Sequence, residues 1–213
     1  MASTAAVYSG AGLVTTITDP TNQSSLHSRL PEAMFMNYND WEPVSQLINN
    51  MDVIVIGPGL GTDPQSLDIL VNVLGQAHEG QTLVIDGSAL TLIAENNLPL
   101  PKSTLNILTP HQMEWQRLSG VKITDQNPTS NQEAANKLNA IVVVKSSRTE
   151  IFIQDKGYQN TVGTPAQATG GMGDTLAGMI GGFVAQFTNK PEAVLAAVYT
   201  HSAIADELAE NQY

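Results

Sequence analysis

The chain has 213 residues, 42% of them hydrophobic, a length and composition that suit one α/β domain with a sizeable core. Its 9 Lys and Arg against 20 Asp and Glu give a net charge of -11, which argues against nucleic acid as a partner because an acidic surface repels phosphate backbones. The absence of cysteine excludes disulfides and thiolate metal sites and fits a reducing cytosol, and no apolar run reaches the roughly 20 residues of a membrane span, so we expect a cytoplasmic protein without a membrane partner.

The first part of the chain predicts alternating helices and strands. Ala2–Tyr8 is expected to be helical and to lead into the first strand. The short runs that follow are apolar throughout, which is typical of strands buried on both faces of a parallel sheet. Helical stretches between them favour crossover connections, and therefore a mainly parallel sheet between helices. The predicted strands are 13–17, 53–56, 83–85, 106–108 and 141–144, and the predicted helices between them include 64–77 and 131–138.

The last part of the chain departs from this alternation. The residues on both sides of Asp155-Lys156-Gly157 predict an antiparallel hairpin. Two helices, about 174–187 and 191–210, then close the chain. No linker or repeat divides the sequence, so residues 1–213 are expected to form a single domain.

A glycine-rich turn follows the predicted strand 53–56. Gly57, Gly59 and Gly61 alternate in the stretch Ile-Gly-Pro-Gly-Leu-Gly. Glycines here permit positive φ and close backbone approach, and the carboxyl ends of strands are where open α/β sheets bind ligands. The alternative is a tight turn between a strand and a helix with no ligand.

The stretch Leu-Thr-Pro-His-Gln-Met-Glu predicts a capped helix. Thr109 is expected to be the N-cap, Pro110 the first helical residue and Gln112 the partner in a capping box. His111 would then lie in the first turn, where the helix dipole disfavours its charged form, and is a candidate neutral donor to a ligand. Glu114 could hold a metal-bound water. The alternatives are a surface histidine and an acid that only compensates the dipole.

A pair of cations ends the predicted strand 141–144. Lys145 and Arg148 lie close together in a chain with only 9 Lys and Arg, which suggests contact with the phosphates or ribose of a nucleotide. We expect Ala at either position to raise the nucleotide KM more than it lowers kcat. An ordinary basic turn is the alternative.

The stretch Gly170-Gly171-Met172-Gly173-Asp174 precedes the long apolar helix 174–187. Glycines at a helix start expose backbone N–H groups to an anion, and the helix dipole adds positive charge. An acid beside a phosphate opposes its binding, so Asp174 is interpreted as the general base for an attacking hydroxyl. The alternative is an aspartate that only stabilises its helix. No Lys-Ser/Thr follows, so this is not a Walker A loop.

Taken in order, these motifs and Asp86-Gly87-Ser88-Ala89-Leu90 resemble the ATP- or ADP-dependent NAD(P)H-hydrate dehydratase family of the ribokinase-like superfamily. The resemblance implies a ribokinase-like layered fold and a lyase that phosphorylates the ring hydroxyl of hydrated NADH or NADPH with ADP or ATP and then eliminates phosphate. It implies Mg²⁺ on the nucleotide phosphates with no direct protein ligand, Glu114 being a candidate through water, and a homo-oligomer. Asp174 resembles the catalytic base and a substrate contact. The implied substrate contacts are also Gly59, Gly61 and His111; the implied nucleotide contacts are Lys145, Ser146, Ser147, Arg148, Thr149, Gly170, Gly171 and Gly173.

The chain departs from the family at two motifs and at its start. Ser146 replaces a glycine in the family's Lys-Gly-small-x-Thr, and Ser88 replaces the second acid of Asp-Ala-Asp-Ala-Leu. Family members place a strand and a glycine-containing turn before the segment that matches Ala2–Tyr8. We therefore expect a domain that lacks its first strand, with an open gap near that helix and weak or no activity of this chain alone. The last predicted helix has no clear cap or breaker, so an incomplete C-terminus is left open as well.

Two other functions fit the same motifs. A ribokinase-like kinase of a vitamin precursor or sugar would use the same anion site and base, but would keep its phosphorylated product. An inactive nucleotide-binding fragment would retain binding alone. Release of inorganic phosphate together with recovery of the reduced nicotinamide distinguishes the dehydratase from both.

Overall fold

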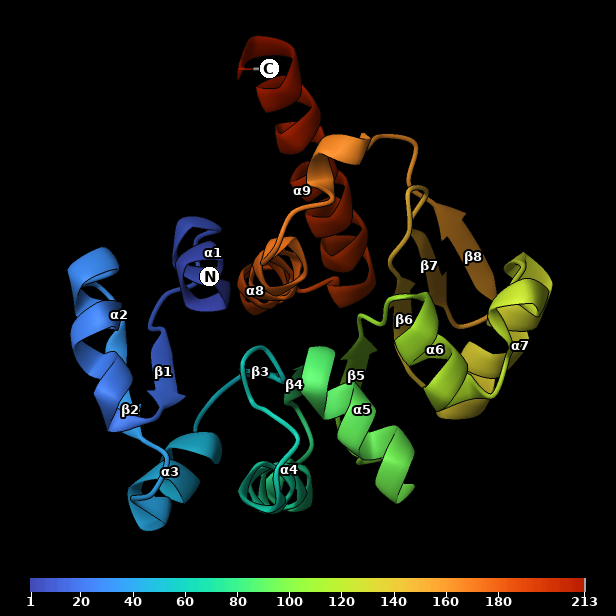
Figure 1. Cartoon of the computed structure of the whole chain (residues 1–213). Helices are drawn as coiled ribbons and strands as arrows, with labels where there is room; N and C mark the ends of the chain where they lie inside the picture. Colours follow the sequence, from blue (N-terminus) through green and yellow to red (C-terminus); the bar gives the residue numbers. More distant parts are fainter. Residues whose placement is uncertain (213) are drawn as a thin grey trace.

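A computed structural model of the chain describes residues 1–212, and its centre is a six-stranded sheet in the order β3-β4-β5-β6-β7-β8 (Figure 1). The strands from β3 to β6 are parallel, and β7 and β8 are antiparallel to their neighbours. The predictions of a mainly parallel sheet and of a terminal hairpin are therefore confirmed. The strands are β3 (Val53–Ile56), β4 (Thr82–Ile85), β5 (Leu105–Leu108), β6 (Ile141–Val144), β7 (Glu150–Ile153) and β8 (Lys156–Gln159).

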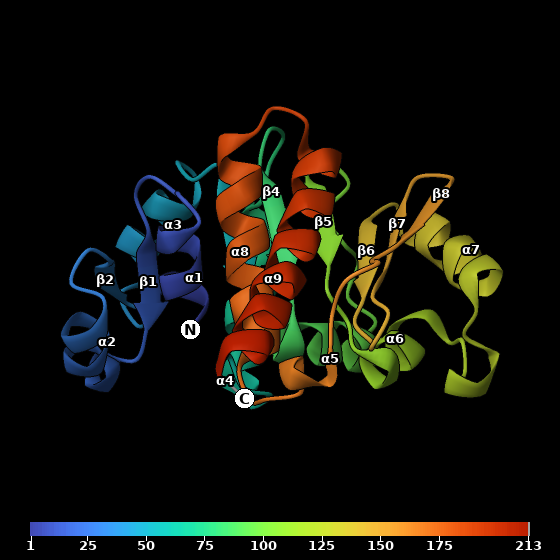
Figure 2. The same ribbon diagram turned by 90° about the horizontal axis from the view of Figure 1, so that it is seen from above.

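Helices cover both faces of this sheet. Successive strand residues point to opposite faces, so Leu83 and Ile85 pack with one set of helices and Val84 with the other. One face carries α4 (Pro64–Gln76), α5 (Gly87–Asn96), α6 (Gln112–Ser119) and α7 (Pro128–Leu138). The other carries α8 (Met172–Gln186) and α9 (Lys190–Gln212), which lie in front of the central strands in Figure 2. Both faces of the central strands are buried, which explains their continuous apolar sequence.

A smaller parallel sheet lies apart from the central one, beside α1 (Ala2–Tyr8) (Figure 1). The helix predicted for Ala2–Tyr8 is confirmed. Residues of α1, β1 and β3 are among those that line a cavity of about 650 Å³. The small sheet contains β1 (Thr15–Thr18) and β2 (Met34–Asn37), accompanied by α2 (Gln23–Arg29), α3 (Trp41–Ile48) and the 3₁₀ turn η1 (Pro20–Asn22).

Element boundaries differ from the predictions by a few residues. The strand predicted at 13–17 starts at Thr15, and Leu13 is exposed. The hairpin turn lies at Gln154 and Asp155, one residue earlier than expected, because Lys156 already pairs with Ile153. Two further 3₁₀ turns are η2 (Ile123–Asp125) and η3 (Pro165–Gln167).

Part of the glycine content of α8 serves helix packing. A Cβ at Gly178 would overlap the carbonyl of Ala2, and one at Gly182 would approach the carbonyl oxygen of Ala6 to 2.9 Å. These glycines, four residues apart on one face of α8, therefore allow α1 to pack closely. Gly181 faces β3 in the same way. Within residues 1–212, no helix combines the length and the apolar composition needed to cross a membrane.

Candidate active site

The carboxyl ends of three neighbouring strands bring a cation, an acid and a hydroxyl together. Asp86 follows β4, Thr109 follows β5 and Lys145 follows β6. The Lys145 Nζ donates to Asp86 Oδ1 at 2.6 Å, and the Thr109 hydroxyl donates to the same oxygen at 2.8 Å. Asp86 and Thr109 are buried, whereas the side chain of Lys145 is 21% exposed, so only the cation is open to a ligand.

The glycine cluster begins α8 directly beside this ion pair. Gly171 is the N-cap with a φ of 88°, no side chain caps the helix, and Asp174 lies half-buried in the first turn. A Cβ at Gly173 would lie 3.3 Å from Lys145 Nζ. The prediction that the glycines start a helix is confirmed. The first N–H groups of a helix have no intrahelical acceptor, so these groups and the ammonium can donate to the same anion.

The cap of α6 differs from the prediction. The N-cap is His111 rather than Thr109, and the helix begins at Gln112. His111 Nδ1 accepts from the N–H groups of Met113 and Glu114, at 3.1 and 3.3 Å. Because Nδ1 is an acceptor, the ring proton of the neutral side chain lies on Nε2, and His111 can donate from there. The Thr109 hydroxyl is instead directed to the Asp86 carboxylate.

Glu114, and not Gln112, completes the capping box. Its Oε2 accepts the backbone N–H of His111 at 2.8 Å, and its Oε1 lies 3.5 Å from His111 Nε2. Both carboxylate oxygens are thus turned toward His111. In this arrangement Glu114 orients His111, and a role as holder of a metal-bound water remains a prediction.

The segment Lys145 to Thr149 forms a tight turn after β6. Ser146 Oγ accepts the Arg148 N–H at 3.1 Å, and the Thr149 hydroxyl donates to the Ser146 carbonyl at 3.2 Å. Neither Ser146 nor Ser147 has a positive φ, so the turn does not need the glycine that the family places there. Ser146, Ser147 and Arg148 are exposed, and their contact with a nucleotide remains a prediction.

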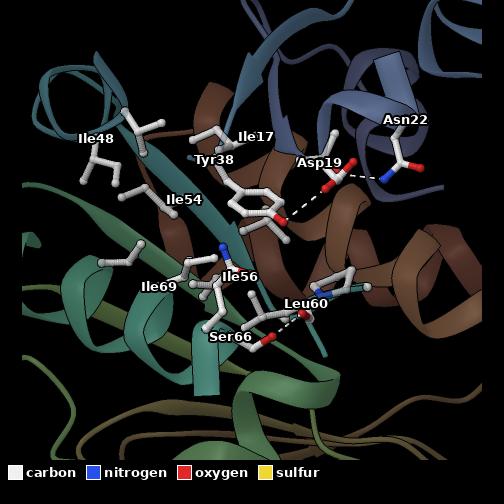
Figure 3. A pocket seen from close by; sticks show the side chains of 18 of the residues that line it. Ile17, Asp19, Asn22, Tyr38, Ile48, Ile54, Ile56, Leu60, Ser66 and Ile69 are labelled. Atoms are coloured by element: carbon white, nitrogen blue, oxygen red, sulfur yellow. Dashed lines mark hydrogen bonds between the residues drawn. The ribbon is translucent and has the colours of Figure 1, made fainter. Parts of the chain in front are cut away.

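A cavity of about 350 Å³ adjoins the other glycine-rich turn (Figure 3). Gly59 lines it, and Gly61 lies two residues further along the chain, before the N-cap of α4. Its wall combines apolar and polar side chains, and the Tyr38 ring lies across it with the hydroxyl donating to Asp19 at 3.1 Å. Hydrogen bonds from Thr21 lower the pKa of Asp19 below its usual 3.8, so it is a carboxylate at neutral pH.

The structure thus groups some of the candidate residues and separates others. The side chain of Lys145 lies beside Gly173, which precedes Asp174. The backbone of Lys145 forms a parallel bridge with that of His111. Gly59 and Gly61 belong to the turn after β3. The first glycine of that turn, Gly57, packs against Asp86, because a Cβ on Gly57 would overlap the Asp86 carbonyl. Sequence reasoning omitted Asp86 from the site. The feature of the sequence that indicates Asp86 is an acid immediately after the apolar run 83–85.

Helix α9 supports the entry to α8 through a buried histidine. His201 is 9% exposed, and among the described residues its Nε2 has no hydrogen-bond partner. Burial lowers the pKa of His201 below its ordinary 6.5, although a hydrogen bond to the Met172 backbone opposes this shift. Met172 is the first residue of α8, so His201 contacts the start of this helix.

This buried histidine predicts a loss of stability in acid. As the pH falls below about 6.5, His201 is protonated in the unfolded chain before it is protonated in the folded one. The stability of the fold is therefore retained above pH 6.5 and falls as the pH drops below it. Thermal unfolding between pH 8 and 5 should show a shallower decline of Tm for His201→Asn than for the parent. His27→Asn, at an exposed position, should keep the parent slope. Equal slopes for His201→Asn and the parent would remove His201 as the cause.

Comparison with known proteins shows the family to which the chain is related. The family model described as NAD(P)H-hydrate dehydratase matches residues 1–213. The chain is 59% identical over 213 residues to the ADP-dependent (S)-NAD(P)H-hydrate dehydratase of Lactiplantibacillus plantarum, covering 100% of this chain and 76% of that one. It is 47% identical to the enzyme of the same name from Staphylococcus aureus, covering 100% of this chain and 77% of that one.

Solved structures agree with this relationship. A ribokinase-like superfamily protein from Enterococcus faecalis superimposes with a TM-score of 0.95 at 47% identity over 98% of this chain and 74% of that one. An ADP/ATP-dependent NAD(P)H-hydrate dehydratase from Bacillus subtilis, co-crystallised with ATP/Mg²⁺, gives 0.84 at 27% identity over 100% and 76%. The fold is therefore the ribokinase-like fold expected from the sequence.

Proposed function

Because the chain belongs to the NAD(P)H-hydrate dehydratase family, we propose that it repairs hydrated NADH and NADPH with a nucleotide as the phosphate donor. ADP is the proposed donor, since the relatives from Lactiplantibacillus and Staphylococcus are both named ADP-dependent. The observation that carries the proposal is the first turn of α8. It combines a glycine-rich helix start without a side-chain cap, the acid Asp174 and the Lys145 ammonium beside Gly173.

The first step is phosphoryl transfer to the hydrated ring. The ring hydroxyl oxygen attacks the terminal phosphorus of ADP, a new O–P bond forms, and the P–O bond to the departing AMP breaks. Asp174 accepts the proton of the hydroxyl. The N–H groups around Gly171 and Gly173 donate to the phosphoryl oxygens, and Lys145 adds positive charge on the same side. Glycine is needed here because a side chain would fill the space next to the phosphoryl group.

The second step is elimination. Hydroxide is a poor leaving group and phosphate a good one. The lone pair of the ring nitrogen expels phosphate as the C–O bond breaks, and a proton is lost from the adjacent ring carbon to restore the double bond. The products are the reduced nicotinamide, AMP and inorganic phosphate. His111, with its Nε2 as donor, and Gly59 and Gly61 are the proposed contacts to the hydrate.

The donor set suits Mg²⁺ held mainly by the nucleotide. Among the described residues, no group of three His, Cys, Asp or Glu is placed to hold a metal. Mg²⁺ in nucleotide sites typically takes few carboxylates and keeps phosphate oxygens and waters as ligands. When bound, it would neutralise charge on the phosphates. Among the site residues proposed above, Glu114 is the candidate to hold the ion, through a water molecule.

The direct test is recovery of the reduced cofactor. Purified protein is mixed with hydrated NADH, Mg²⁺ and either ADP or ATP, while nicotinamide absorbance and free phosphate are followed together. We expect absorbance and phosphate to rise in equal amounts, with faster turnover on ADP. A phosphorylated product that accumulates without recovered absorbance would instead identify a ribokinase-like kinase.

Arg148 provides a prediction for the nucleotide. It is exposed in the turn after β6, three residues beyond Lys145. A contact there would bind ground and transition states alike, so Arg148→Ala should raise the ADP KM about tenfold and leave kcat within about twofold. Arg117→Ala, at an exposed position on α6, is the matched control and should change neither constant. An unchanged ADP KM in the Arg148 variant would place that side chain outside the nucleotide site.

A further inference from the structure

We propose that Asp86 is a positioning residue that holds the Lys145 ammonium against the first turn of α8, where the cation acts on the phosphoryl group during transfer. The proposal rests on the proposed function, because it assigns a step to that reaction. It adds to the site an acid that acts through Lys145, and it assigns to Lys145 the stabilisation of the transition state.

The contacts of Asp86 span three strands. Its Oδ1 accepts from Lys145 Nζ at 2.6 Å and from the Thr109 hydroxyl at 2.8 Å. Since β5 lies between β4 and β6, the carboxylate at the end of β4 reaches across β5 to the cation at the end of β6. Thr109, at the end of β5, fixes the carboxylate from the strand between. A single oxygen thus links the ends of three neighbouring strands.

The backbone of Asp86 is fixed as well. Its N–H donates to the Ile56 carbonyl at 3.0 Å, and Gly57 packs so closely that a Cβ there would overlap the Asp86 carbonyl. Asp86 is also the N-cap of α5, a position where aspartate usually accepts from its own helix. Here its side chain makes no capping hydrogen bond. The carboxylate is instead directed to Lys145 and Thr109.

The held cation faces the reacting group. A lysine side chain is flexible, so an unanchored ammonium would sample many positions. Anchored by Asp86, Lys145 Nζ lies 3.3 Å from where a Cβ of Gly173 would be. A phosphoryl group bound to the first turn of α8 would therefore meet this cation. A charge fixed there before the reaction stabilises the transition state, which changes the expectation for Lys145 from an effect on KM to an effect on kcat.

The test is a double-mutant cycle of Asp86→Asn and Lys145→Met. We expect each single variant to lower kcat for hydrate repair about 10- to 100-fold, with the ADP KM changed less than about threefold. The double variant should be no slower than Lys145→Met alone, because Asp86 acts only through the cation. An equal loss from Asp86→Asn in both backgrounds, or a parent-like kcat, would overturn the proposal.

A second variant covers a failure of Asp86→Asn to fold. Thr109→Val keeps the side-chain shape and the ion pair but removes the hydrogen bond that fixes the carboxylate. It should lower kcat about 2- to 10-fold in the parent and have no effect in the Lys145→Met background. The same loss in both backgrounds would contradict the assigned role.

A binding measurement separates this proposal from the function on which it rests. AMP with Mg²⁺ and aluminium fluoride imitates the phosphoryl group in transfer and needs no hydrate. Calorimetry should show tighter binding of this mixture than of AMP with Mg²⁺ alone, and Asp86→Asn should reduce that gain about 10- to 100-fold. If the parent fails to repair hydrate but shows this pattern, only the function fails. If it repairs hydrate while Asp86→Asn keeps the full gain, only the role of Asp86 fails.

Discussion

Asp174→Asn is expected to lower kcat for hydrate repair by about 10²–10⁴-fold, the usual loss when a general base is removed. The substitution keeps the shape of the side chain in the first turn of α8 but removes its ability to accept the proton of the attacking hydroxyl. ADP should bind as well as before, or more tightly, because a negative charge beside the phosphates is gone. The measurements are steady-state kinetics with hydrated NADH and calorimetric titration with ADP and Mg²⁺.

The matched control is Asp68→Asn, at an exposed position on α4, which should keep both parent values. Turnover near the parent rate in the Asp174 variant would contradict the proposed mechanism. Loss of ADP binding together with turnover would instead make Asp174 a structural or metal-holding residue. The titration therefore decides between roles that kinetics alone would confuse.

Gly173→Ala is expected to separate activity from stability. Gly173 lies within α8 and its φ is not positive, so alanine fits the backbone and has the higher helix propensity. The added Cβ would stand 3.3 Å from Lys145 Nζ, in the space assigned to the phosphoryl group. Displacing that group by about 1 Å can cost on the order of 10²-fold in rate. We therefore expect kcat to fall about 10²-fold or more while Tm stays the same or rises.

Gly75→Ala is the control for the propensity effect. Gly75 lies in α4, and a Cβ there would meet no atom within 4 Å. Alanine should stabilise the fold by up to about 1 kcal/mol without changing kcat. A Gly173→Ala variant that retains parent activity would show that the phosphoryl group binds elsewhere. A fall in its Tm would show instead that the close approach to Lys145 strains the fold.

The sequence by itself determined the layered α/β fold and the main motifs. Short apolar runs such as Val53–Ile56 and Ile141–Val144 indicate buried parallel strands, because they contain no alternating polar residues that would face solvent. The glycines before Asp174 indicate the start of a helix, and α8 does begin there with Gly171 as its N-cap. The resemblance to known dehydratases rests on the same local motifs, and comparison with relatives confirmed the family.

Only the tertiary structure decided which residues meet. Asp86, Thr109 and Lys145 are separated by more than twenty residues each in the chain, and strand order alone places them side by side. Thr109 was expected to cap α6, but its hydroxyl is directed to Asp86 and His111 is the N-cap. A capping motif is defined by residues that are neighbours in the chain, so it does not include a hydrogen-bond partner that follows another strand. Gly178 and Gly182 look like part of the glycine cluster in sequence, but packing against α1 accounts for them, because close helix contacts depend on a partner that is distant in the chain.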